Sequence, residues 1–91
     1  MKKRLLKALE ACAKAHNVPF WHSNDMVTIT GISVPTLSDV QTIVDAFYGR
    51  HNHVCTDPFF DSIDVYIEDY PMLDKVDKAL LKTALPAGVT V

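Results

Sequence analysis

The stretch from Ser62 to Glu68, SIDVYIE, decides the fold class because its polar and apolar residues alternate. Ile63, Val65 and Ile67 fall on one side of an extended chain, and the residues between them fall on the other. A strand with one apolar and one polar face is typical of an antiparallel or mixed sheet that is covered on one side only. We therefore expect helices against one face of a sheet and solvent against the other.

Further strand patterns lie toward the N-terminus. Residues 26–30 alternate Val27 and Ile29 with threonines, which predicts a half-buried strand. Residues 20–22 are expected to pair with this strand as a hairpin, because residues 23–25 are the turn formers Ser, Asn and Asp. The alternation is clear only in the second arm, so whether residues 19–22 form a strand stays open from the sequence alone.

The central alternating strand has a neighbour just before it in the chain. Residues 53–57 and 60–68 predict two strands joined by a tight turn at Asp57 and Pro58, where Asp suits the first position of a type I turn and Pro the second. Residues 87–91 could add a short final strand. Whether this terminal segment joins the sheet decides the exact topology.

Three segments have the apolar period of a helix. Residues 3–16 form the first. The second is expected to start at Thr36 as N-cap and to end at Gly49, which suits a left-handed residue after a helix. The third is expected to start at Pro71 and to end before Pro86. Helices and strands therefore alternate along the chain with short connections.

The order of these elements predicts an α+β fold, a two-layer sandwich whose mixed or antiparallel sheet has helices on one face. Without the arm at 19–22, residues 26–91 give the β-α-β-β-α-β order of the ferredoxin-like fold, preceded by an N-terminal helix. The apolar stripes of strands and helices must face each other to be buried. The predicted shared core is Val27, Ile29, Val40, Val44, Phe47, Ile63, Val65, Ile67, Val76 and Leu80.

Length and composition indicate one globular domain, residues 1–91, with 48% apolar and 22% charged residues. The basic N-terminus is interrupted by Lys7, Glu10 and Lys14, so it lacks the unbroken apolar region of a signal peptide. Cys12 and Cys55 lie in unrelated contexts, which gives no reason to expect a disulfide. We expect a soluble, cytoplasmic protein with reduced thiols.

Charge is divided unevenly along the chain although the net charge is only −2. The cations Lys2, Lys3, Arg4 and Lys7 gather at the start of the first helix, where they oppose the helix dipole. A polyanion contact there would explain them, but short basic N-termini are commonly just solvated. Residues 56–74 carry carboxylates and no cation, so the chain is basic at its start and acidic past its middle.

The stretch GRHNHVCTD places His51, His53, Cys55 and Asp57 two residues apart. Imidazole and thiolate groups are good zinc ligands, but the paired clusters that make a zinc prediction strong are missing. The simpler interpretation is a helix exit followed by a strand entry, with Cys55 either a small apolar core residue or, if Val54 faces the core, a solvent-facing one. We therefore predict no metal and no cofactor.

The α-β-β-α-β-β-α order is similar to that of the pterin carbinolamine dehydratases, which use a His-His-Pro cluster. The corresponding stretch here is His51-Asn52-His53, so the second His and the Pro are missing, and no histidine follows His53. No other catalytic or cofactor motif is present. The dehydratase activity is not carried over, and the protein is not expected to be an enzyme.

Because the sequence has no catalytic or cofactor motif, we expect the function to be protein binding. The carboxylates of the 60–68 strand argue against an RNA-binding sheet. We expect a regulator or inhibitor that contacts a larger protein with a basic surface, similar in general style to the small phage proteins that block host enzymes. Phe59 and Phe60 are expected to complete the core. The expected contact residues are Trp21, Asp61, Asp64, Tyr66 and Glu68.

Two alternatives remain open from the sequence. The stretch 51–57 could make the protein a metal- or small-ligand-binding domain. The basic start, residues 2–7, could make it an accessory protein that contacts nucleic-acid phosphate. Stoichiometric zinc would favour the first alternative, and salt-dependent nucleic-acid binding would favour the second.

Overall fold

The sheet and its covering helices follow the α-β-β-α-β-β-α order along the chain. A computed structural model describes residues 2–49, 54–67 and 72–89. The helices are α1 (Lys2–Ala15), α2 (Val34–Tyr48) and α3 (Lys78–Ala84). The strands are β1 (Phe20–His22), β2 (Met26–Thr30), β3 (Val54–Asp57) and β4 (Ser62–Tyr66).

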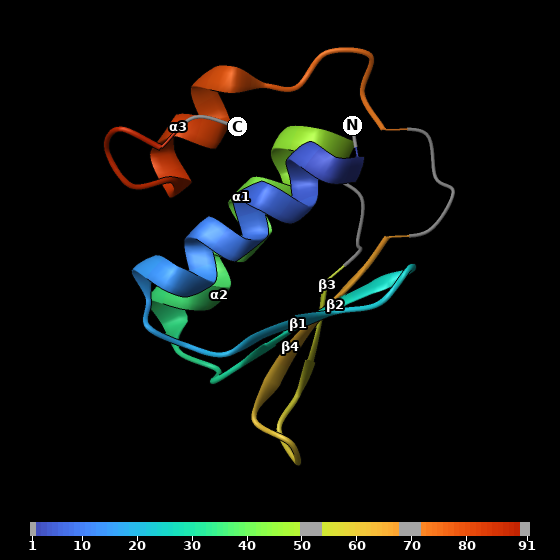
Figure 1. Cartoon of the computed structure of the whole chain (residues 1–91), viewed down its shortest axis with the longest axis vertical. Helices are drawn as coiled ribbons and strands as arrows, with labels where there is room; N and C mark the ends of the chain where they lie inside the picture. The colour runs from blue at the N-terminus through green and yellow to red at the C-terminus, as the bar shows by residue number, and fades with distance from the viewer. Residues whose placement is uncertain (1, 50–53, 68–71, 90–91) are drawn as a thin grey trace.

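The four strands form one antiparallel sheet in the order β1-β2-β4-β3. Figure 1 shows α1, α2 and α3 on one side of this sheet, and no helix of the described residues covers its other face. The predicted α+β class is therefore confirmed. The hairpin between residues 20–22 and 26–30 is confirmed as well, because Phe20 pairs with Ile29 and His22 pairs with Val27.

The ferredoxin-like β-α-β-β-α-β order is not confirmed. That order needs a strand after the last helix, but residues 86–89 form a turn and irregular chain, and residues 90–91 lie outside the described residues. Strand β1 occupies the sheet edge beside β2. The N-terminal hairpin therefore supplies the fourth strand of the sheet.

The core lies between the sheet and the helices, as the alternating pattern predicts. Ile63 and Val65 of β4 are fully buried, and they pair with Ile29 and Val27 of β2. The predicted core is confirmed except at Leu80, which is only partly buried. The remaining predicted core residues all belong to the buried cluster: Val27, Ile29, Val40, Val44, Phe47, Ile63, Val65, Ile67 and Val76.

The last helix starts later than the sequence predicts, and this explains the error at Leu80. Residues 72–77 are not helical, and Pro71 lies outside the described residues. Asp77 is the N-cap of α3, because its carboxylate accepts a hydrogen bond from the backbone N–H of Leu80 at 3.1 Å. The short helix buries Leu81 and Ala84 in place of Leu80.

Helix α2 also has an earlier N-cap than predicted. Ser33 caps the helix: its hydroxyl accepts from the backbone N–H of Thr36 at 3.3 Å, so Thr36 lies inside the first turn. The C-terminal prediction holds, because Gly49 has a φ of 78° and its N–H donates to the carbonyl of Asp45. A β-carbon at Gly49 would strain this conformation.

Helix α1 packs an apolar stripe against α2 and the sheet. Leu5, Leu9 and Cys12 are fully buried at helical spacing. Among the described residues, no helix is both long enough and apolar enough to cross a membrane.

Candidate functional site

The face of the sheet that points away from the helices is the most extensive candidate site, and we call it the open face. Because side chains alternate along a strand, the register assigns its members. One row crosses all four strands, with Trp21 opposite Thr28, Thr28 opposite Asp64, and Asp64 opposite Cys55. The described residues of the open face are Trp21, Met26, Thr28, Thr30, Cys55, Asp57, Ser62, Asp64 and Tyr66.

The open face combines aromatic rings with carboxylates. Trp21 is 58% exposed and Tyr66 is 39% exposed. Asp64 is half-buried, and its carboxylate accepts a hydrogen bond from the Thr28 hydroxyl at 2.9 Å. None of the described residues on this face is Lys or Arg. The face therefore offers apolar contact area and negative charge together.

One of the expected contact residues, Asp61, stands apart from this face. Asp61 lies in the β3–β4 turn with a φ of 51°. Its carboxylate accepts from the backbone N–H of Ile32 at 3.0 Å, and its carbonyl accepts from the N–H of Gly31. Asp61 therefore joins two segments of the fold. Glu68 lies outside the described residues.

The turn between β3 and β4, residues 58–61, forms a second candidate contact that we call the hairpin tip. Asp57 fixes the turn, because its carboxylate accepts from the backbone N–H groups of Phe59 at 3.0 Å and Phe60 at 3.3 Å. The two rings meet edge to face with centroids 4.9 Å apart. They are 86% and 68% exposed, so the expectation that they complete the core is wrong.

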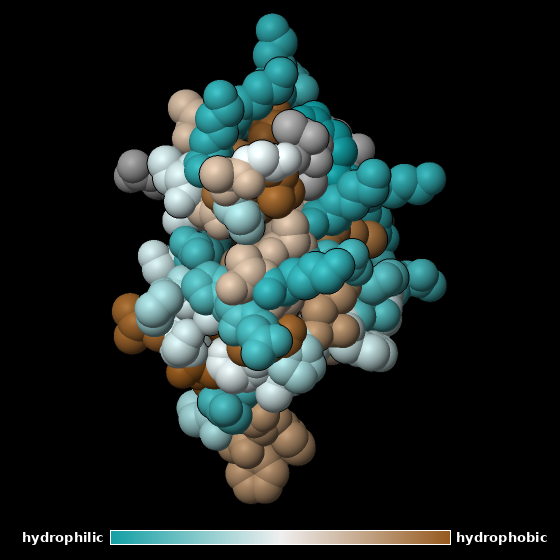
Figure 2. All heavy atoms as spheres, turned by 60° about the vertical axis from the view of Figure 1, so that its left-hand side comes forward, coloured by the Kyte–Doolittle hydropathy of each residue, from teal (hydrophilic) through white to brown (hydrophobic). Residues whose placement is uncertain are grey.

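The hairpin tip projects from the rest of the molecule. Figure 1 places the β3–β4 turn at its lower end, and Figure 2 shows apolar side chains protruding there. The sequence could not place these rings, because two adjacent phenylalanines in a turn have no period that indicates which side is buried. The feature of the sequence that could have indicated exposed rings was the Asp57-Pro58 turn, since turn residues lie at the surface.

The stretch 51–57 lies only partly within the described residues. His51 and His53 lie outside them. Cys55 is exposed and free on the open face, so the interpretation of Cys55 as a buried core residue is wrong. Val54 packs against the core instead. The Asp57 carboxylate accepts a hydrogen bond from the backbone of the hairpin tip.

The basic residues at the start of α1 have separate neighbours. The Lys2 ammonium donates to the carbonyl of Asn24. Lys3 and Lys7 are exposed, one helical turn apart. Arg4 is half-buried and lines a pocket between α1 and α3. One of these cations therefore contacts the β1–β2 turn, two face solvent, and one lines the pocket.

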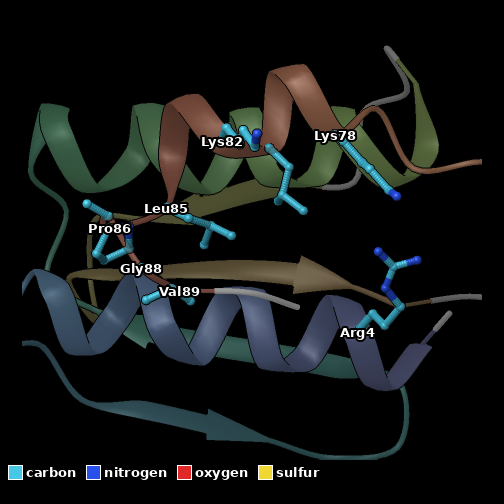
Figure 3. A pocket seen from close by; sticks show the side chains of 9 residues that line it. Arg4, Lys78, Lys82, Leu85, Pro86, Gly88 and Val89 are labelled. Atoms are coloured by element: carbon cyan, nitrogen blue, oxygen red, sulfur yellow. The ribbon is translucent and has the colours of Figure 1, made fainter.

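The pocket beside Arg4 has a volume of about 520 Å³. Figure 3 shows Arg4 from α1 and Lys78 from α3 extending toward the same end of it. Its apolar wall includes Leu81, Leu85 and Val89. Cations beside an apolar wall suit a small anionic molecule with an apolar part.

A polar cluster joins α1 to α2. The Nε2 of His16 lies 2.7 Å from the Oδ2 of Asp39, and ligating atoms of Cys12, His16 and Asp39 all lie within 4.8 Å of one another. Burial, followed by the Asp39 carboxylate, raises the pKa of the Cys12 thiol to about 11. A thiol that is buried and protonated at neutral pH is a poor nucleophile. The trio therefore does not support cysteine catalysis.

The fold and the open face together define a small α+β protein with a sheet surface that none of its described helices covers. Comparison of the chain with known protein families, curated proteins and solved structures finds no significant match.

Proposed function

We propose that the protein is a small regulator or inhibitor that binds a larger protein by surface contact. The observation that carries this proposal is the exposed ring pair of Phe59 and Phe60 at the hairpin tip. Exposed apolar side chains that gather in one place are typical of interaction sites, whereas single ones are common on any surface. Asp57 holds the turn that presents both rings.

The proposed contact extends from the hairpin tip onto the open face, and its chemistry indicates the kind of partner. Trp21 and Tyr66 are aromatic residues of the type that anchors interfaces. Asp57 and Asp64 add negative charge, which speeds the approach of a basic surface. We propose a partner with an apolar pocket rimmed by lysine or arginine. The free thiol of Cys55 fits a reducing compartment such as the cytoplasm.

Capture from an extract of the native host tests this proposal. The wild-type chain and a Phe59→Ser/Phe60→Ser double variant are immobilised, and bound proteins are compared by quantitative mass spectrometry. We expect one specific partner to bind the wild-type chain and to be depleted from the double variant. Both rings are largely exposed, so the variant should keep its fold, which circular dichroism checks.

Val34 provides the matched control. It is 82% exposed at the start of α2, so Val34→Ser removes an exposed apolar side chain that does not belong to the hairpin tip. This variant should retain the partner. Equal capture by the wild-type chain and the double variant, or loss with Val34→Ser alone, would contradict the proposed contact surface.

A further inference from the structure

The polar cluster of Cys12, His16 and Asp39 lies among the helices and has no part in the proposed protein contact. Cys12 lies in the last turn of α1, and His16 directly follows the helix with its N–H bonded to the Cys12 carbonyl, so the two residues are one helical turn apart. Asp39 reaches them from α2. We infer that these three side chains bind one zinc ion.

The ligand types select the metal. A thiolate and an imidazole favour zinc over magnesium or calcium, which prefer a shell of oxygen atoms. The thiolate and the carboxylate together carry two negative charges, which balance the charge of Zn²⁺ in a partly buried place. The ion would also lie at the C-terminal end of α1, where the helix dipole is negative.

The distances require only a small rearrangement. Zinc bonds of about 2.0–2.3 Å in tetrahedral geometry place ligand atoms roughly 3.3–3.8 Å apart. The ligating atoms of the three side chains already lie within 4.8 Å of one another. The 2.7 Å hydrogen bond between His16 and Asp39 has to open slightly as both groups turn to the ion. Side-chain rotation of His16 and Asp39 supplies this movement.

The site also has an entry path. The side chains of His16 and Asp39 are 22% and 34% exposed, whereas Cys12 is fully buried beneath them. An ion can therefore arrive from solvent at the imidazole and carboxylate and then meet the sulfur. Three protein ligands leave a fourth position for water on the solvent side. Because the ligands come from two helices, the bound ion would crosslink α1 and α2.

Cobalt(II) titration of the full chain, stripped of metal with a chelator and kept reduced, tests this inference. Cobalt replaces zinc in such sites, and a cobalt–thiolate bond adds a charge-transfer band in the near ultraviolet. We expect one equivalent of cobalt to produce this band in the wild-type chain, and zinc to abolish it by displacement. Zinc should also raise the melting temperature.

Variants assign the ligands. Cys12→Ser should lose the charge-transfer band. Removing a group that merely orients a metal ligand costs roughly 10–100-fold in affinity, so His16→Gln and Asp39→Asn, which remove ligands, should weaken zinc binding at least as much. Circular dichroism checks that each variant is folded. Because His16 and Asp39 are partly exposed, their variants decide the matter if Cys12→Ser fails to fold.

Cys55→Ser is the control, since it removes the other thiol from the exposed open face. It should leave both the band and the zinc affinity unchanged. No band with the wild-type chain would overturn the inference, and so would a band that depends on Cys55 in place of Cys12. Unchanged zinc affinity in folded His16→Gln and Asp39→Asn variants would overturn it as well.

Discussion

Cys12 and Cys55 show how the environment of a single residue sets its chemistry. Cys12 is fully buried in the helical layer, where desolvation raises the pKa of its thiol. Cys55 lies on the open face, opposite Asp64, and is exposed. One thiol is shielded from solution reagents and the other is accessible to them. The same substitution at the two positions should therefore have different consequences.

Cys55→Ser should leave the free energy of unfolding unchanged within about 0.5 kcal/mol, the usual range for an exposed position. Cys12→Ser should lower it by roughly 1–3 kcal/mol, because a hydroxyl costs more to bury than a thiol and this position is fully buried. Denaturant unfolding with reductant and chelator present measures both values. A large loss at Cys55 would mean that this thiol is buried, contrary to its place on the open face.

The raised pKa of Cys12 predicts a loss of stability at alkaline pH. Below about pH 9 both the folded and the unfolded chain keep the thiol proton, so the buried neutral thiol makes its full contribution to the free energy of unfolding. Between there and about pH 11 the unfolded chain loses the proton first, and stability falls. At about 1.4 kcal/mol for each pKa unit, the total loss is roughly 2–3 kcal/mol. Unfolding measured from pH 8 upward with chelator present tests this prediction.

Cys12→Ala is the control for this pH dependence, because lysines and tyrosines also titrate in the alkaline range. Subtracting the alanine variant's curve from the wild-type curve isolates the thiol. The wild-type chain should lose stability more steeply than the variant. Parallel curves would show that the thiol ionises as easily in the folded state as in the unfolded state.

At the scale of single elements, the strands and the start of α1 were predictable, and the starts of α2 and α3 were not. The alternation of polar and apolar residues around Ile63 and Val65 fits only one orientation of the strand. Shifting the strand by one residue would expose both side chains to solvent. The start of α3 was predicted at Pro71, but Pro and Asp both suit a helix N-terminus, and Asp77 is the residue that caps the helix. Only the packing of Leu81 against the core selects Asp77.

Asp61 gives a prediction at this scale, because it joins the β3–β4 turn to the chain that follows β2. Asp61→Ala removes the acceptor for the N–H of Ile32 and places alanine at a φ of 51°, so it should cost about 1–2 kcal/mol of stability. Asp61→Asn keeps an acceptor and tolerates the left-handed conformation, so it should cost less. Equal losses in denaturant unfolding would contradict the structural role assigned to Asp61.

At the scale of the whole molecule, α1, α2 and α3 lie on one side of the sheet, and within residues 2–49, 54–67 and 72–89 no helix covers the other side. The polar pattern of the central strand predicted this division. The Cys12, His16 and Asp39 cluster was not predictable in the same way. His16 and Asp39 are 23 residues apart, and only the packing of α1 on α2 brings them together. Local periodicity indicates which side of an element is buried, but it does not identify the partner across the interface.

The open face gives the last prediction, which concerns the kinetics of binding to the captured partner. Asp64→Asn removes a charge but keeps an acceptor for the Thr28 hydroxyl, so the fold should be preserved. It should slow association and weaken its salt dependence, because charges chiefly set encounter rates. Tyr66→Ala should instead cost about 2 kcal/mol of binding free energy, mostly through faster dissociation.

Surface plasmon resonance over a range of salt concentrations separates these two effects. Glu10→Gln makes the same charge change on the exposed side of α1, so it controls for net charge. If association slows as much with Glu10→Gln as with Asp64→Asn, the effect belongs to the total charge of the chain, and the open face does not steer the partner. If Tyr66→Ala leaves dissociation unchanged, the aromatic contact must be confined to the hairpin tip, where Phe59 and Phe60 are more exposed than Tyr66.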